Sequence, residues 1–454
     1  MYFECNIPKR IPQYYHPAIY QQLADTVALI HERTEKLNMA LDNCILPGCA
    51  TREATFAKIA RGIFNFDKEH PGELFDRLTP VELANLASSL YDGIDAEDRI
   101  EWPNAIVAFD AAFVTTKDWE SLRHIGIGGS DSSVLMGVNP YQTEEGLWYE
   151  KLGYPEFISE EGKQAIFDRG HFLEDKVIET FCRLVGARRI PETRMFISRT
   201  HPNTTANIDA ILLMPNGRLA IFEAKTATRG KEGEWMGNKI PANYVSQCHQ
   251  YLAVLDDPRV EGAYIGMIPV ADITLDGTYI ASAYNEDFYY HFIERDEGYE
   301  EELLENEKYY WETYIVNGIK PPKSKDPALD KQTMLRYTPT PLSDTSIPAQ
   351  ELSYEQWENQ LNTLVKTEKE YAEKKAALDQ LEQVRDAARL EIMETMNGAQ
   401  SAVYKNAAGE TVVTVKNTAI VKTMIDAKKL KQFYPQAYEA TKRESVYTRF
   451  SFKN

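Results

Sequence analysis

Apolar residues recur at helical spacing in several stretches of the chain. Residues 20–41 and 80–90 show this spacing in the N-terminal region, and a further helix is expected to open at Pro241. Residues 164–184 predict a longer amphipathic helix. Its expected apolar stripe is Ile166, Phe167, Val177, Ile178, Phe181 and Leu184.

The pattern between and after these helices is different. The apolar run 219–222 predicts a strand that ends directly before Glu223. Residues 352–396 have apolar positions near heptad spacing and predict a long charged helix or a helical hairpin, which Asn397 and Gly398 stop. Residues 411–415 predict a short β region, and a last helix is expected from Ala427.

These elements group into four regions. Residues 1–116 form an N-terminal helical region of unknown role, and residues 117–320 hold the α/β core. The prolines of residues 321–350 indicate a linker, and residues 351–454 are expected to form a helical and small α+β region. A chain of 454 residues is long enough for two or three domains.

Composition narrows the class of protein. The formal net charge of −19 argues against a protein that coats DNA nonspecifically, although it leaves room for a local basic channel. After residue 415 the chain has nine basic residues and three acidic ones. This basic tail is either a DNA-binding patch or a solvated face. The sequence lacks a long apolar run or a secretion signal, and its five scattered cysteines suit a reducing compartment, so we expect a cytoplasmic protein with no membrane partner.

The candidate chemistry begins with two acids and a lysine. Asp209 precedes Glu223 by fourteen positions, and Lys225 follows Glu223 by two, so Glu223 and Lys225 fall on one face of a strand. Converging carboxylates are ligands for hard divalent cations, and phosphodiester hydrolysis needs an activated water. Two solvated charges at a strand end are the alternative for this pattern alone.

Two flanking helices add to the pattern. Glu174 lies in the helix predicted at residues 164–184, where Phe172 and Leu173 are expected to face the core and Glu174 the edge of the apolar stripe. Gln247 lies in the helix that opens at Pro241. The order is helix with Glu, strand, strand with Asp, strand with Glu-x-Lys, and helix with Gln.

A further motif lies upstream: Trp119, Arg123 and the glycine-rich run 126–130, which ends in Ser130. With this motif, residues 117–320 resemble the PD-(D/E)xK nuclease superfamily, and within it the YqaJ-like viral recombinase and lambda exonuclease family. The resemblance implies an α/β, restriction-endonuclease-like core, a mixed sheet flanked by helices. It does not extend to the N-terminal helical region or the C-terminal helical and α+β region.

The resemblance also implies roles for individual residues. Asp209, Glu223, Glu174 and the carbonyl of Ala224 would hold Mg²⁺, with Mn²⁺ as an alternative. Lys225 would position or help deprotonate the attacking water, and Gln247 would orient the same water or the scissile phosphate.

Recognition of the DNA end is implied for other residues. Arg123 and Ser130 would bind a 5′-terminal phosphate, for which an arginine fork and a hydroxyl beside glycine amides are suited. This sequence departs from the family pattern at two positions. Ile208 stands where a proline is usual, and Asn207 stands where lambda exonuclease has a serine. The latter departure bears on end recognition.

Several residues also have structural interpretations. The glycines at 126, 128 and 129 could make a tight turn with positive φ, and Asp131 is expected to cap a helix that starts near Ser132. His171 is interpreted as a surface or packing residue. Tyr244 and Tyr251 suit core packing or DNA contact equally, while the aromatic clusters at 289–290 and 309–311 are expected to pack.

The leading hypothesis is a metal-dependent DNA exonuclease. By resemblance it acts 5′ to 3′ on double-stranded ends, leaves 3′ single strands for a single-strand annealing protein in phage-type recombination, and could form a homo-oligomer, a trimer. A structure-specific or restriction-type endonuclease and an inactive DNA-binding or partner-binding adaptor are the alternatives. We expect no iron-sulfur cluster, because related RecB-like nucleases carry three cysteines after the core and this chain has none after Cys248.

Overall fold

The computed structural model describes ten parts of the chain. They are residues 3–43, 51, 100–110, 114–157, 163–190, 192–228, 231–237, 239–270, 288–338 and 353–416. The chain divides into two compact units, Met1–Pro339 and Thr340–Asn454.

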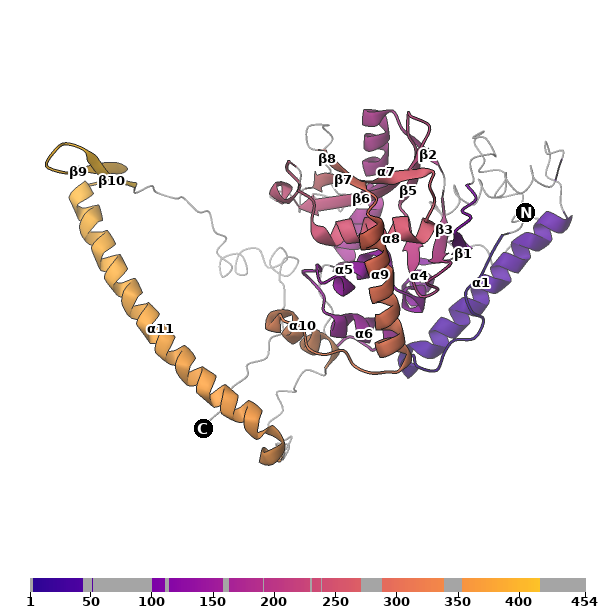
Figure 1. Ribbon diagram of the computed structural model, residues 1–454, viewed down its shortest axis with the longest axis horizontal. Coiled ribbons are helices and arrows are strands. Elements are labelled where there is room, and N and C mark those ends of the chain that lie inside the picture. Colours follow the sequence, from indigo (N-terminus) through magenta and orange to yellow (C-terminus); the bar gives the residue numbers. More distant parts are fainter. Residues whose placement is uncertain are drawn as a thin grey trace, which may run out of the picture. The chain divides into compact units, whose positions relative to one another are not determined.

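The helices and strands of the described residues are shown in Figure 1. The helices are α1 (Pro17–Asn43), α4 (Thr116–Leu122), α5 (Gly129–Leu135), α6 (Glu144–Leu152), α7 (Lys163–Val185), α8 (Ala242–Leu255), α9 (Glu297–Tyr310), α10 (Pro327–Tyr337) and α11 (Tyr354–Met396). The strands are β1 (Ala105–Asp110), β2 (Arg188–Ile190), β3 (Arg194–Ser198), β4 (Thr205–Asn207), β5 (Ala210–Leu213), β6 (Leu219–Thr228), β7 (Val260–Val270), β8 (Tyr289–Glu294), β9 (Ser401–Lys405) and β10 (Thr411–Lys416).

A mixed five-stranded sheet is the centre of the first unit. Its strand order is β2-β5-β6-β7-β8. The β6 and β7 strands pair in parallel, while the other neighbours pair antiparallel. A parallel pair needs a crossover connection, and α8 supplies it between β6 and β7. A second, antiparallel sheet has the order β1-β3-β4.

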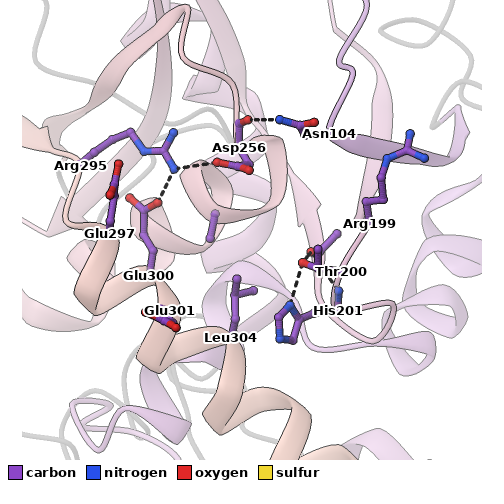
Figure 2. A pocket seen from close by; sticks show the side chains of 12 residues that line it. Asn104, Arg199, Thr200, His201, Asp256, Arg295, Glu297, Glu300, Glu301 and Leu304 are labelled. Atoms are coloured by element: carbon purple, nitrogen blue, oxygen red, sulfur yellow. Dashed lines mark hydrogen bonds and ion pairs between the residues drawn. The ribbon is translucent and has the colours of Figure 1, made fainter.

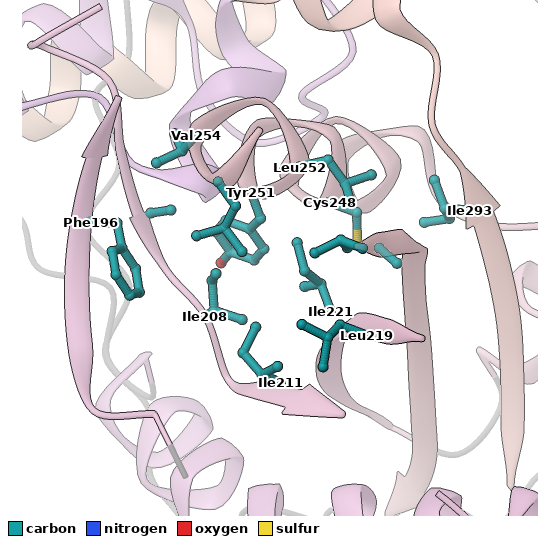
Figure 3. Close-up of a cluster of buried hydrophobic side chains, with 14 of the residues drawn as sticks. Phe196, Ile208, Ile211, Leu219, Ile221, Cys248, Tyr251, Leu252, Val254 and Ile293 are labelled. Carbon is teal, nitrogen blue, oxygen red and sulfur yellow. The ribbon is translucent and has the colours of Figure 1, made fainter. Parts of the chain in front are cut away.

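Helices cover both faces of the five-stranded sheet, and alternation along β6 decides which residue meets which helix. Phe222 faces α7, where its ring centroid lies 4.7 Å from that of Phe181. Ile221 faces the other way and packs in a buried cluster with Cys248 and Leu252 of α8 (Figure 3). Since side chains alternate with a period of two, Glu223 and Lys225 project toward α8. The mixed sheet between helices is the predicted fold class.

The predicted helix at residues 164–184 is confirmed as α7, but two of its expected core positions are wrong. Leu173 is buried, whereas its neighbour Phe172 is 65% exposed, because successive residues point about 100° apart around a helix. Leu184 is 41% exposed in the last turn of the helix. The side chains of Ile166, Phe167 and His171 lie outside those described.

The helices expected at residues 20–41 and from Pro241 are confirmed as α1 and α8, with Pro241 as the N-cap of α8. The proline-rich stretch, expected to be a linker, contains helix α10. Asp326 caps it by accepting bonds from two backbone amides, and Pro327 opens it with a fixed φ. The α10 helix packs on α6, where Tyr337 and Tyr149 stack with centroids 4.7 Å apart. The pattern of scattered prolines concealed this helix.

The second unit contains one long helix followed by a hairpin. Of the two forms that the pattern allowed, α11 takes the single helix and ends at Asn397, whose φ is 44°. The predicted β region is the antiparallel pair of β9 and β10. The helices expected at residues 80–90 and from Ala427, and nearly all of the basic tail, lie outside the described residues. In the part of the chain that is described, no helix is long and apolar enough to cross a membrane.

Candidate active site

Asp209 and Glu223 lie side by side at one point of the sheet. Asp209 immediately precedes β5 rather than lying within a strand, as the sequence pattern had placed it. Its Oδ2 accepts a hydrogen bond of 2.8 Å from the backbone amide of Ala224 on β6. Since Ala210 pairs with Phe222, the antiparallel register brings Asp209 next to Glu223 and Ala224. Pairing of β5 with β6 therefore closes a separation of fourteen residues.

Glu223, Lys225 and Gln247 form one hydrogen-bonded group. The Lys225 ammonium donates to Glu223 Oε1, and Gln247 Nε2 donates to the same oxygen at 2.7 Å. Gln247 Oε1 accepts from Lys225 Nζ at 3.3 Å. The ammonium also lies 4.8 Å from the ring centroid of Tyr244, as in a cation-π contact. The amide of Gln247 is thus held in one orientation, because its nitrogen must face the carboxylate.

The carboxylates repel one another. Burial raises the pKa of Asp209 well above its ordinary value, and the charges of Glu223 and Glu174 raise it further. Burial lowers the pKa of Lys225, but the charges of Glu223 and Asp209 outweigh this and raise it. Glu174 is half-buried and comes from α7, on the opposite side of the sheet from Gln247. Its charge acts on Asp209 more weakly than the charge of Glu223 does.

One carboxylate oxygen of Glu223 has no hydrogen-bond partner among the described residues. This oxygen, Oε2, is buried. A buried acceptor without a partner costs about 1–3 kcal/mol, and more when charged. At the same time, no group of three or more His, Cys, Asp or Glu within the described ranges is already arranged to hold a metal ion. Lys225 and Gln247 both donate to Oε1 of Glu223. A cation would therefore fit Oε2 of Glu223 and the carboxylate of Asp209.

Helix α8 carries two further residues, Gln250 and Tyr251, whose contacts around the site the sequence did not predict. The Tyr251 hydroxyl accepts a 2.7 Å hydrogen bond from Gln247 Nε2, and the tyrosine is 4% exposed. Gln250 is fully buried and donates at 2.8 Å to the backbone carbonyls of Ile127 and Thr205. The only signal in the sequence is helical spacing, since Tyr251 lies four residues and Gln250 three residues after Gln247. Of the two interpretations of Tyr251, the structure shows core packing.

The glycine-rich run lies directly against α8. Positive φ is not the reason for its glycines: φ is −169° at Gly126 and −90° at Gly128, and Gly129 opens helix α5. At Gly126 and Gly129 the reason is space, because a Cβ on Gly126 would lie 2.7 Å from Thr205 Cγ2. A Cβ on Gly129 would lie 2.5 Å from Tyr251 Cε1 and 3.0 Å from Gln247 Cγ. The run therefore touches the residues that hold the Glu223 group.

The predicted phosphate-binding residues lie around this run. Arg123 follows α4, is 42% exposed, and forms an ion pair of 3.3 Å with Glu150 of α6. Ser130 is exposed in the first turn of α5, and Asn207 is exposed at the end of β4. Asp131 caps α5 as expected, but from its third position: the helix starts at Gly129, and Asp131 Oδ2 accepts from the Gly128 amide at 2.8 Å.

A separate cavity of about 340 Å³ lies beyond the other end of α8 (Figure 2). It is lined by Asp256 at that end, Glu300 of α9 and Arg295, among others. Arg295 forms ion pairs of 2.6 Å with Glu300 and 3.3 Å with Asp256. None of the predicted catalytic or phosphate-binding residues lines this cavity.

The match to a family model agrees with the resemblance seen in the sequence. Residues 118–257 match the family model of the YqaJ-like viral recombinase domain. The Uncharacterized protein YqaJ of Bacillus subtilis (strain 168) is 26% identical over 337 residues, which cover 74% of this chain and 93% of that protein. Among solved structures, an alkaline exonuclease (LHK-Exo) from Laribacter hongkongensis is 17% identical with a TM-score of 0.32, covering 45% of this chain and 94% of that one. A phage related exonuclease from Haemophilus somnus 129PT is 16% identical with a TM-score of 0.32, covering 44% of this chain and 99% of that one.

Proposed function

Because the chain carries a YqaJ-like viral recombinase domain over residues 118–257, we propose that it is a divalent-metal-dependent deoxyribonuclease that digests the ends of double-stranded DNA. One observation carries the proposal. Asp209 and the Glu223–Lys225–Gln247 group lie together, and Glu223 keeps one buried oxygen without a donor among the described residues. In phosphodiester hydrolysis a carboxylate pair can bind the metal that activates the water, and a lysine and an amide can orient that water or the phosphate.

The donor set fits Mg²⁺, with Mn²⁺ as an alternative. Hard cations take carboxylate and carbonyl oxygens, and a cation between Asp209 and Glu223 would offset both the burial and the repulsion that raise the pKa of Asp209. Glu174 and the carbonyl of Ala224 would complete the ligand set. When bound, the metal would supply a water of lowered pKa as the nucleophile.

The remaining residues orient the reactants. The ammonium of Lys225 donates to Glu223 Oε1, and as a donor it would hold the water or offset charge on the phosphate. Gln247 is fixed by three hydrogen bonds, to Glu223, Lys225 and Tyr251, and holds its amide toward the same point. A fixed amide needs no reorganisation during the reaction.

The direction of digestion is the finer part of the proposal. Arg123 and Ser130 flank the glycine-rich run and would bind a 5′-terminal phosphate, through a guanidinium and a hydroxyl beside backbone amides. Digestion from that end runs 5′ to 3′ and leaves a 3′ single strand for an annealing protein. A trimer that encloses the duplex belongs to the same proposal.

Digestion of end-labelled linear duplex tests both parts. The duplex carries a label at the 5′ or the 3′ end and a 5′-phosphate or a 5′-hydroxyl, and reactions contain Mg²⁺ or EDTA. We expect Mg²⁺-dependent loss of the 5′ label, faster with phosphate, while a covalently closed circle stays intact. Cleavage of the circle would instead indicate an endonuclease.

Asp209→Asn is the matched variant for the metal site. The asparagine oxygen can still accept from the Ala224 amide, so folding is preserved while the charge is lost. We expect cleavage to fall below detection with DNA binding retained. Wild-type cleavage by this variant would reject the assignment of Asp209.

A further inference from the structure

Lys151 on α6 is a buried cation outside the residues assigned so far. Its side chain is 1% exposed. The ammonium donates at 2.8 Å to the backbone carbonyl of Arg123 and lies 2.5 Å from Asp131 Oδ2. Lysine is rarely buried to this extent unless it is paired. The two contacts reach residues on different elements, so the ammonium links them.

These two residues belong to the two halves of the proposed phosphate site. Arg123 supplies the guanidinium. Asp131 Oδ2 also accepts from the backbone amide of Gly128, and it lies next to Ser130. Lys151 therefore joins the main chain behind the guanidinium to the turn that presents the hydroxyl and the backbone amides.

The residue before Lys151 forms an ion pair with the guanidinium of Arg123. Glu150 precedes Lys151 and holds Arg123 at 3.3 Å, while its other oxygen accepts from Gln142 at 2.9 Å. Burial would raise the pKa of Glu150, but the charges of Arg123 and Lys151 lower it to about 2. Consecutive residues of α6 thus hold the side chain and the main chain of Arg123, and this segment of α6 forms the back wall of the site.

We propose that Lys151 is a positioning residue for recognition of the 5′-phosphate: it sets the separation between Arg123 and the turn at residues 128–130. This inference rests on the proposed function. The ammonium is buried behind the main chain and acts through Arg123 and the turn. Its contribution falls on binding of the phosphorylated end, because its contacts are to Arg123 and Asp131, whereas Glu223 is held by Lys225 and Gln247.

The test compares KM and kcat on linear duplexes with a 5′-phosphate or a 5′-hydroxyl. Lys151→Met alone would leave the Asp131 charge buried without its partner, which can unfold the protein. The principal variant is therefore Lys151→Met combined with Asp131→Asn, which has no buried charge and still offers an acceptor to the Gly128 amide. Lys320→Met is the control, since it removes an ion pair with Glu145 of the same helix.

We expect the double variant to raise KM for the 5′-phosphate duplex about tenfold, as for the loss of a charge-assisted hydrogen bond, with kcat and the KM for the 5′-hydroxyl duplex unchanged. Lys320→Met is expected to match the wild type. An unchanged preference for phosphate in a folded double variant overturns the inference. Equal losses on both duplexes also overturn it, because they indicate a general structural role.

The wild type separates failure of the inference from failure of the proposed function. Wild-type protein that degrades both duplexes equally well retains the nuclease assignment, but it has no phosphate site for Lys151 to position. Wild-type protein that degrades neither duplex removes the proposed function and the inference together. Arg123→Gln gives the reference for complete loss of preference.

Discussion

Gly129→Ala is the substitution whose outcome the structure predicts most sharply. The added Cβ would lie 2.5 Å from Tyr251 Cε1, whereas ordinary contacts begin near 3.4 Å, so the ring has to move by about 0.9 Å. Tyr251 is 4% exposed and belongs to the buried cluster under α8, which offers little room. Overpacking of this kind costs about 1–3 kcal/mol.

The backbone opposes this loss only slightly. Gly129 begins helix α5, so alanine suits its conformation and gains at most about 1 kcal/mol from helix propensity. Since the buried ring has little room to move, we take the upper part of the overpacking range, about 2–3 kcal/mol, and after the helix gain we expect the free energy of unfolding to fall by about 1–2 kcal/mol. Because Tyr251 holds Gln247, we also expect kcat to fall about a hundredfold, as for misplacement of a reacting group by about 1 Å.

Urea unfolding and steady-state digestion of linear duplex measure the two effects. Gly298→Ala is the matched control: it is also in the first turn of a helix, and a Cβ there would lie 3.5 Å from Asp296 Oδ1, an ordinary contact. A Gly129→Ala protein with wild-type stability would refute the packing argument. Lower stability with an unchanged kcat would refute the link from the glycine-rich run to Gln247.

Two other substitutions test single interactions. Tyr251→Phe removes the hydroxyl that accepts from Gln247, and it should cost about 1 kcal/mol of stability and lower kcat about tenfold with little change in KM; an unchanged kcat would contradict it. Glu307→Gln tests a buried carboxyl whose pKa burial raises well above 4.5, with Thr204 as its hydrogen-bond donor. Above pH 4.5 the unfolded chain releases this proton while the folded one keeps it, so stability should fall as pH rises, by up to about 1.4 kcal/mol per pH unit, until the folded pKa is reached. The glutamine variant should lack this slope in urea unfolding between about pH 5 and 7, and parallel profiles would contradict the assignment.

The sequence predicted much of the arrangement because the chemistry follows from periodicity. Glu223 and Lys225 fall on one face of a strand at any register, and the mixed sheet between helices was expected from the family motifs. Asp209 was placed on a strand, and it lies one residue before one, where strand ends depend on pairing that the sequence does not show. The proximity of Asp209 to Ala224 is likewise a result of β5–β6 register.

Other features were beyond sequence reasoning because they depend on tertiary contacts. Phe172 and Leu173 are adjacent apolar residues, and only packing of α7 on the sheet decides which is buried. The role of Gly129 lies in the ring placed against it, which is 122 residues away in the chain. Lys151 resembles any lysine of a charged helix until its burial is known.

Gln247 and Gln250 lie three residues apart on α8, and this spacing couples two parts of the candidate site. One glutamine is bonded to Glu223, and the other to the carbonyl of Ile127 at the start of the glycine-rich run. Three residues rise about 4.5 Å along a helix, so α8 holds the glycine-rich run and Glu223 at a fixed separation along its axis. A substitution that displaces α8 would therefore disturb both contacts together, and one that disturbs a single contact would have to act on a single glutamine side chain.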